Sequence, residues 1–522
     1  MNNGMEVVSN LDNTVNTVNT VNTVNTVNTV NTVNTENTEN IIHRVFLCYP
    51  PGAMYQRGED RSQGNISDSA ATVMRAPNDM GYSAAILRQN KFDVIFRDFQ
   101  TEGLLEADFI DEFLQYKPDV IVISVTNSTI KEDLMIVSKL KKINQKLVVV
   151  LKGALFFDAP PEVISSLDLN NINYLIGGEI EFSIGPLLDA HYNDLNITQV
   201  PGILFRDVNN QWVKNIFGEW NSDIDALPFP DRSLINNKLY IRPDTGKPQA
   251  TIVTSRGCPA ACIYCLTPTI SGKKVRFRSP QNILDELREC YHTYGIKDFF
   301  FRSDTFTIDS KWVKEVCEKI NQSELNGKIE WVANSRVKPL ADDTLKIMKN
   351  AGCWLVAFGF ESGSFDSLKK MKKGANVQDN IRAARLAKEA GLKLYGFFLI
   401  GLPWESKDHL EETYNHIFEI DADFIEVHLS VPYFGTELYD VTKEAGLLNR
   451  SIIGTDYFHA STSGTRFISS NDLLKFRRNL LLKYHLRPLY ILRKLKEAIL
   501  SPEKFINYFR FGSRLILNNL KS

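Results

Sequence analysis

Three of the seven cysteines lie close together, in the stretch SRGCPAACIYC at 255–265. Their spacing is Cys258-x3-Cys262-x2-Cys265, and the Gly and Pro beside the first cysteine indicate a loop rather than a core segment. Three thiolates can hold three irons of a [4Fe–4S] cluster and leave the fourth iron open to a small molecule. The alternative is a zinc site with a distant fourth ligand such as His292.

The cysteine stretch follows the first strand of a repeating pattern. Six strand-like runs separated by helical segments predict a partial (β/α)6 barrel over residues 248–445. Catalytic residues of such barrels lie at the C-terminal ends of the strands, which is where the cysteines are. The expected strands are 249–255, 297–304, 329–336, 354–362, 392–401 and 424–431.

A second α/β unit precedes the barrel, over residues 42–195. Short and nearly continuous apolar runs alternate with helix-like segments such as 131–142, which predicts a doubly wound, Rossmann-like parallel sheet. Its ligand is expected at the carboxyl ends of the strands. The expected strands are 44–49, 92–98, 119–125, 146–153 and 172–178.

The segment between these units, 196–247, is read as a hairpin followed by a linker. The hairpin turns at Asn209-Asn210, and the linker at 223–235 carries two prolines.

The composition limits the classes of function. The chain has 522 residues and a net charge of −2, so no global field favours a nucleic-acid partner. The four remaining cysteines are scattered along the sequence and do not form the pattern of a disulfide-bonded protein. Their distribution therefore indicates a reducing, cytoplasmic compartment. We expect neither a signal peptide nor a transmembrane helix.

The first 40 residues have low complexity. Asn-Thr-Val repeats seven times from residue 13 to 33, and Asn-Thr-Glu follows twice. A period of three with one modest apolar residue buries almost nothing, so a disordered tail is predicted over 1–40.

The cysteine motif, with Tyr264 before its last cysteine, resembles the signature of the radical S-adenosylmethionine (SAM) superfamily. The N-terminal unit and the linker LPFPDRSLI resemble the cobalamin-binding branch of that superfamily. Further matching motifs follow in order along the barrel: SDTFTID (303–309), FGFESGS (358–364), GLPWES (401–406) and PYFGTELY (432–439).

This resemblance implies three cofactors, namely a [4Fe–4S] cluster on the three cysteines, SAM and cobalamin. It implies cleavage of SAM to a 5′-deoxyadenosyl radical, with an electron donor such as flavodoxin or ferredoxin and a small-molecule substrate. The expected activity is methyl transfer from methylcobalamin to an unactivated carbon. The first alternative is radical cyclisation, rearrangement or anaerobic oxygenation of a lipid, tetrapyrrole or natural-product scaffold. The second is a non-catalytic cobalamin-binding or sensor protein, which would not need the intact cysteine motif.

The resemblance also implies residues that bind SAM. Glu361 is expected to accept from the ribose hydroxyls, and Arg336 to pair with the SAM carboxylate. Asp304 would hold the SAM amino group or a substrate group, Gly401 would shape the loop beside the adenine, and Tyr264 belongs to the same set. Each residue also has an ordinary structural alternative, such as a salt bridge, a cap or a turn.

Cobalamin is expected at small residues that follow the strands of the N-terminal unit, where backbone can approach a ligand closely. The alternative for each position is the turn that starts a helix. The candidates are Ser124, Val125, Thr126 and Asn127 after the third strand, Gly153 and Ala154 after the fourth, and Gly177, Gly178 and Glu179 after the fifth.

A histidine ligand to cobalt is not expected. The segment from Asp189 to Asp194 approaches the Asp-x-His-x-x-Gly pattern through His191, but it lacks the Gly and follows the fifth strand instead of the first. The loop after the first strand contains no histidine. We therefore expect base-off cobalamin without a histidine nitrogen on cobalt.

Two basic segments remain. Residues 471–522 hold twelve Lys/Arg and three Asp/Glu, within a helical C-terminal segment over 446–522. We read this segment as a cap on the barrel with a solvated basic face; the alternatives are a peripheral membrane contact or a site for an anionic substrate. The short run MKKG at 371–374 is predicted to be a solvated loop.

Overall fold

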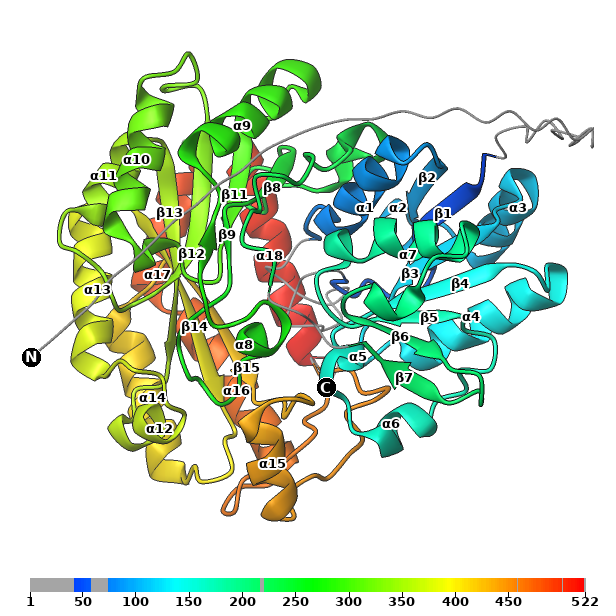
Figure 1. Cartoon of the computed structure of the whole chain (residues 1–522). Helices are drawn as coiled ribbons and strands as arrows, with labels where there is room; N and C mark the ends of the chain where they lie inside the picture. Colours follow the sequence, from blue (N-terminus) through cyan, green and yellow to red (C-terminus); the bar gives the residue numbers. More distant parts are fainter. Residues whose placement is uncertain (1–41, 58–73, 216–219, 458, 500, 521–522) are drawn as a thin grey trace, which may run out of the picture. The chain divides into compact units, whose positions relative to one another are not determined.

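The computed structural model describes residues 42–57, 74–215, 220–457, 459–499 and 501–520 (Figure 1). Two sheets covered by helices make up most of these residues. The predicted disordered tail, residues 1–40, lies outside the described part of the chain.

The first sheet has the strand order β2-β1-β3-β4-β5-β6-β7, and β1 to β5 run parallel. Side chains of β1 alternate between two cores, with Phe46 and Cys48 on one face and Val45 and Leu47 on the other. Both faces are therefore covered, which confirms the predicted doubly wound α/β arrangement. We call residues 44–214 the N-terminal lobe. Its strands are β1 (Arg44–Tyr49), β2 (Asp93–Asp98), β3 (Val120–Ser124), β4 (Val148–Lys152), β5 (Tyr174–Ile176), β6 (Ile203–Arg206) and β7 (Trp212–Lys214), and its α-helices are α1 (Asn78–Gln89), α2 (Phe99–Glu102), α3 (Glu106–Tyr116), α4 (Ile130–Ile143), α5 (Leu155–Asp158), α6 (Pro161–Ser165) and α7 (Ile184–Tyr192).

The hairpin β6–β7 belongs to this sheet. It pairs antiparallel with β5 and so extends the sheet by two strands. Asn210 takes a positive φ of 61° in the turn, which asparagine tolerates better than most residues. The segment that the sequence assigned to a connection between domains thus begins as part of the N-terminal sheet.

The second sheet has six parallel strands in the order β15-β14-β13-β12-β11-β8. Its edges are the first and last strands of the series, so it is the partial barrel that the sequence predicts. The strands are β8 (Gln249–Val253), β11 (Asp298–Arg302), β12 (Glu330–Arg336), β13 (Cys353–Glu361), β14 (Lys393–Ile400) and β15 (Phe424–Leu429), and the helices between them are α9 (Pro280–Tyr294), α10 (Ser310–Asn321), α11 (Thr344–Asn350), α12 (Phe365–Lys370), α13 (Val377–Glu389) and α14 (Lys407–Ile420).

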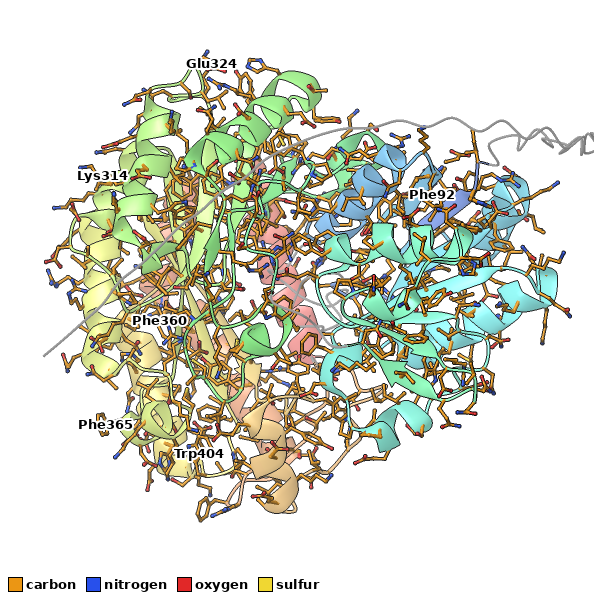
Figure 2. All side chains as sticks on the ribbon, viewed as in Figure 1. Phe92, Lys314, Glu324, Phe360, Phe365 and Trp404 are labelled. Carbon is orange, nitrogen blue, oxygen red and sulfur yellow. The ribbon has the colours of Figure 1, made fainter. Side chains whose placement is uncertain are left out.

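The barrel strands present alternate residues to two environments. On β12, Trp331 and Ala333 belong to the core between sheet and helices, whereas Asn334 and Arg336 are partly exposed. Figure 2 shows Phe360 of β13 among packed side chains, in agreement with its full burial. This alternation directs the other set of residues toward the interior of the barrel.

A two-stranded antiparallel ribbon follows β8, formed by β9 (Ser255–Arg256) and β10 (Arg276–Phe277). The connection between its strands carries the three cysteines and the short helix α8 (Thr267–Ile270). The ribbon is therefore the stem of the cysteine loop.

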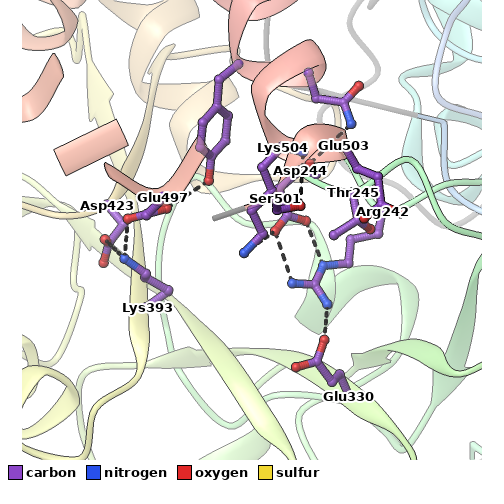
Figure 3. A network of polar contacts seen from close by, with 12 residues as sticks. Arg242, Asp244, Thr245, Glu330, Lys393, Asp423, Glu497, Ser501, Glu503 and Lys504 are labelled. Atoms are coloured by element: carbon purple, nitrogen blue, oxygen red, sulfur yellow. Dashed lines mark hydrogen bonds and ion pairs between the residues drawn. The ribbon is translucent and has the colours of Figure 1, made fainter. Parts of the chain in front are cut away.

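Two C-terminal helices, α17 (Pro488–Ile499) and α18 (Pro502–Leu520), pack on the barrel at the start of its strands. Lys393, the first residue of β14, donates to Asp423 (2.8 Å) and to Glu497 (2.6 Å), and Glu497 also accepts from the Tyr508 hydroxyl (Figure 3). These contacts place the helices as a cap, which is the first of the predicted alternatives. None of the described helices is both long and apolar enough to cross a membrane. The other helices after β15 are α15 (Glu437–Glu444) and α16 (Ser470–His485).

Candidate active site

The cysteine loop begins at a position that only glycine fits. Gly257 has a φ of +88°, and a Cβ there would stand 2.2 Å from the carbonyl oxygen of Lys274. Its N–H donates to Asp304 Oδ2 at 2.7 Å. Asp304, which the sequence assigned to SAM or substrate, thus fixes the entrance to the loop from the end of β11.

The three cysteines have free thiols that share one environment. Cys258 and Cys262 are buried and Cys265 is half-buried. Burial raises the pKa of Cys258, and the neighbouring Cys265 and Cys262 side chains raise it too. The N–H of Thr267 donates to the Cys265 sulfur at 3.5 Å, and the Thr267 hydroxyl lies 3.2 Å from the same sulfur.

Arg336 joins the third barrel strand to this loop. Its Nη1 donates to Cys262 Sγ at 3.2 Å, and its Nη2 donates to the carbonyl of Lys373. Burial has the largest single effect and lowers the pKa of the guanidinium, but Cys262, Tyr264 and Cys258 together raise that pKa, so the net direction is upward. Arg336 therefore stays cationic beside a cysteine, where it favours the thiolate.

Lys373 corrects one prediction. The run MKKG is not a solvated loop, because the Lys373 side chain is 3% exposed and its Nζ lies 2.6 Å from Glu361 Oε1. The same ammonium is 3.4 Å from the hydroxyl of Tyr264. Glu361 itself has a φ of +66° at a bulge between β13 and β14, a strained conformation of the kind that gathers at functional sites. The structure thus brings together Tyr264, Arg336 and Glu361, with Lys373 as the residue that sequence reasoning missed.

Gly401 lies in a loop closed by a second missed residue, Glu405. The Glu405 carboxylate accepts from the N–H of Gly401 (2.7 Å), the N–H of Leu402 (3.1 Å) and the hydroxyl of Ser367 (3.0 Å). Burial raises its pKa to about 7 despite these donors. The signal for it was the motif GLPWES, in which a Glu precedes the helix start.

The predicted cobalamin residues lie at the carboxyl edge of the N-terminal sheet, and several are tightly packed. A Cβ on Gly153 would stand 2.8 Å from the side chain of Val125, and one on Gly177 would stand 2.4 Å from the backbone of Phe157. Ser124 donates to Asp79 at 3.3 Å. The glycines here serve close packing between strand ends. Thr126, Asn127, Ala154 and Gly178 follow the same strand ends.

Glu179 pairs with the stem of the cysteine loop. It is buried, accepts from both terminal nitrogens of Arg276 (2.9 and 2.6 Å), and lies 3.3 Å from Arg256 Nη1. Arg256 also pairs with Glu181. The structure therefore gives Glu179 a definite electrostatic role, which is to bind the ribbon β9–β10 to the N-terminal lobe.

Further contacts join the carboxyl edges of the two sheets. The Ser128 hydroxyl donates to the carbonyl of Thr455 at 2.7 Å, and a Cβ on Gly435 would stand 2.9 Å from Asp158. Gly435 follows β15, and its carbonyl accepts from Thr269 of α8 at 3.0 Å. The ends of β3 and β4 thus adjoin the cysteine loop and the end of β15.

His191 lies at the opposite edge of the N-terminal sheet. Its Nδ1 is 2.8 Å from the hydroxyl of Tyr174, the first residue of β5. Its neighbour Tyr192 stacks on His43, which directly precedes β1. This histidine is therefore far from the strand ends where cobalamin is predicted, in line with its rejection as a cobalt ligand.

Two family models match this chain. The radical SAM superfamily model matches residues 252–417, and the B12 binding domain model matches residues 77–181. The chain belongs to the cobalamin-binding branch of the radical SAM superfamily. An uncharacterized methyltransferase of Pyrococcus horikoshii is 28% identical over 428 residues, which cover 81% of this chain and 90% of that protein.

Two further comparisons place this radical SAM enzyme. The anaerobic magnesium-protoporphyrin IX monomethyl ester cyclase of Cereibacter sphaeroides is 25% identical over 69% of this chain and 59% of the cyclase. The structure of the radical SAM methyltransferase TsrM from Kitasatospora setae, with cobalamin and a [4Fe–4S] cluster bound, superimposes with a TM-score of 0.61. That likeness covers 77% of this chain and 78% of TsrM at 16% identity, and it shows a shared fold.

The cofactors of this radical SAM enzyme are a [4Fe–4S] cluster, SAM and cobalamin. The residues of the cysteine loop fit the cluster, because three free thiols gather there beside a guanidinium and a threonine that donate to sulfur. The zinc alternative fits less well. His292, its proposed fourth ligand, is largely exposed on α9 and lies 3.5 Å from Glu324, which Figure 2 shows at the periphery.

Proposed function

We propose that this enzyme is a cobalamin-dependent radical SAM methyltransferase acting at an unactivated carbon of a small-molecule substrate. One observation carries the proposal. The cysteine loop at the carboxyl edge of the barrel is bound, through its stem, to Glu179 at the carboxyl edge of the N-terminal sheet. A methyl carrier and a radical generator have to serve the same substrate carbon, and these two edges are where the two cofactors are expected.

The proposed roles combine the family resemblance with the contacts of these residues. In this proposal Cys258, Cys262 and Cys265 hold the cluster, and Glu361 accepts from the SAM ribose. Lys373 orients Glu361 through the 2.6 Å ion pair, and the Tyr264 hydroxyl lies beside both groups. When bound, the cofactors supply an organic radical derived from SAM and a methyl group carried on cobalamin.

The predicted cobalamin contacts remain part of the proposal. They consist of the residues that follow the strands of the N-terminal lobe. Among them Ala154, Gly178, Thr126 and Asn127 stand at strand ends, and Gly153 and Gly177 allow those ends to pack closely.

The test uses protein reconstituted anaerobically with iron, sulfide and cobalamin, and SAM that carries a CD₃ methyl group. With candidate extracts as the source of substrate, we expect 5′-deoxyadenosine and a product three mass units heavier than with ordinary SAM. A cyclase or a rearrangement enzyme would form 5′-deoxyadenosine and a product without label. A cobalamin sensor would form neither, and that result would contradict an enzymatic role.

We propose flavodoxin or ferredoxin as the electron donor and the cytoplasm as the compartment. Either donor should replace dithionite in the assay above. Failure of both, with dithionite active, would contradict the assignment.

We also propose that the C-terminal helices contact a membrane surface. α17 and α18 pack against each other, and their outward faces carry seven large apolar side chains that are 47–81% exposed. Exposed Lys496, Arg510 and Arg514 lie on the same two helices. An apolar face with basic neighbours suits a surface of anionic lipid. The apolar residues are Leu489, Leu492, Leu495, Ile499, Phe505, Ile506 and Phe509.

Co-sedimentation with vesicles of phosphatidylcholine and phosphatidylserine tests this contact. We expect binding at low salt, weaker binding at high salt, and loss of binding when Leu492 and Ile499 are both changed to Glu. Met135→Glu alters an equally exposed residue of the N-terminal lobe and should bind normally. Absence of binding at low salt would contradict the membrane contact. A dimer in solution that the double variant abolishes would show instead that a second copy of the chain covers this face.

A further inference from the structure

Arg336 makes a contact that the expected role in SAM binding does not require. Its Nη1 donates to Cys262 Sγ at 3.2 Å, and its Nη2 is held by the carbonyl of Lys373. A guanidinium is planar, so two anchors on different nitrogens fix its orientation toward the sulfur. Both interactions lie in a partly buried part of the site, where water screens charge poorly.

We propose that Arg336 raises the reduction potential of the cluster by hydrogen bonding to one of its sulfur ligands. The proposal rests on the assignment of Cys262 to a [4Fe–4S] cluster. Reduction adds one electron from an external reductant and makes the cluster more negative, and no bond or proton is exchanged. A fixed N–H donor and a positive charge next to a ligating sulfur stabilise the reduced form more than the oxidised form.

Lys373 gives an internal comparison. Its side chain is buried, but the ammonium pairs with Glu361 at 2.6 Å, so much of its field is neutralised. Its anchor for Arg336 is the backbone carbonyl, which a side-chain substitution leaves in place. Arg336 should therefore dominate the effect on the potential, and the Lys373 side chain should contribute less.

The experiment is a redox titration of anaerobically reconstituted protein without SAM, followed by electron paramagnetic resonance of the reduced cluster. In Arg336→Met we expect the reduction equilibrium to shift at least tenfold toward the oxidised form, which is about 59 mV for one electron. Arg336→Lys keeps the positive charge but not the planar guanidinium with its two donors, and it should shift the reduction equilibrium less than Arg336→Met does. Lys372→Met is the matched control, because Lys372 is exposed and pairs with Glu437 at 2.7 Å, and it should leave the potential unchanged.

An unchanged potential in Arg336→Met with full iron content would overturn the proposal. If that variant loses iron, Arg336→Gln decides in its place, with the same direction of shift expected and an unchanged potential again contradictory. A loss of SAM affinity without any shift in potential would return Arg336 to the predicted pairing with the SAM carboxylate. Absence of a reducible [4Fe–4S] signal in the unmodified protein would instead refute the proposed function.

Discussion

Glu405 makes the stability of the barrel depend on pH. The carboxyl group is fully buried, and burial raises its pKa from 4.5 to about 7. In the unfolded chain the group ionises near 4.5, so the folded state binds the proton more tightly than the unfolded state. The stability gained from this difference is present below pH 4.5 and is lost as the pH rises toward 7.

The magnitude follows from the two pKa values. The difference between 4.5 and about 7 corresponds to about 3 kcal/mol, of which roughly 2 kcal/mol is lost between pH 5.5 and pH 8. The glutamine side chain of the Glu405→Gln variant stays neutral at every pH in this range. Its carbonyl oxygen can accept from the N–H groups of Gly401 and Leu402, and its amide can donate to the Ser367 hydroxyl, as a protonated carboxyl group can.

The assay is urea unfolding of cofactor-free protein, followed by tryptophan fluorescence, at pH 5.5 and pH 8. We expect the stability of Glu405→Gln relative to the unmodified protein to increase by roughly 2 kcal/mol from the lower to the higher pH. Any constant cost of the substitution cancels in this comparison. Glu411→Gln, on the exposed face of the same helix α14, controls for the loss of one surface charge. An equal difference at both pH values would refute the reasoning.

Three other outcomes follow from the site. Changing Cys258, Cys262 and Cys265 together to Ala should remove the brown chromophore and about four irons per chain, and full iron retention would count against the cluster. His191→Ala should leave cobalamin bound, and the paramagnetic spectrum of cob(II)alamin should lack nitrogen superhyperfine splitting in both proteins; splitting that vanished in the variant would identify His191 as a ligand. Glu179→Gln removes the carboxylate partner of the buried Arg276 and one of the two carboxylates beside the buried Arg256, and urea unfolding should show a loss of about 3–5 kcal/mol. A loss below 1 kcal/mol would mean that this ion pair does not hold the lobes together.

The strands could be predicted because their apolar runs report burial directly. The runs at 44–49 and 329–336 end within one residue of β1 and β12, and the helix expected at 131–142 is α4. A nearly continuous apolar run has few ways to avoid water other than a strand covered on both faces. The hairpin turn was equally readable, but its pairing with β5 was not, because local sequence does not specify the partner of an edge strand.

The polar contacts of the site were harder to predict, because they depend on partners distant in the sequence. Lys373 is predicted to be solvated because MKKG is a short basic run, yet the end of β13 supplies Glu361 as its partner. Glu179 is predicted as a cobalamin contact from its place after the fifth strand, but its pairing with Arg276, 97 residues away, could not be predicted from the sequence. A sequence shows which residue types stand at a strand end, whereas the fold decides which of them face one another.

The pairing of Glu179 with the ribbon has a consequence for how the two halves of the enzyme work together. Parallel strands direct all their functional loops to one edge, so two such sheets can act on one substrate only when these edges face each other. A weak, solvent-exposed contact would allow the edges to separate. Here the carboxylate and the two arginines are all buried, and removing one partner from such a buried group strongly lowers the stability of the fold. Because the arginines belong to the stem of the cysteine loop, the contact that holds the edges together also fixes the loop expected to bind the cluster. In the proposed arrangement, the position of the radical source relative to the methyl carrier is therefore determined by the same residues that join the lobes.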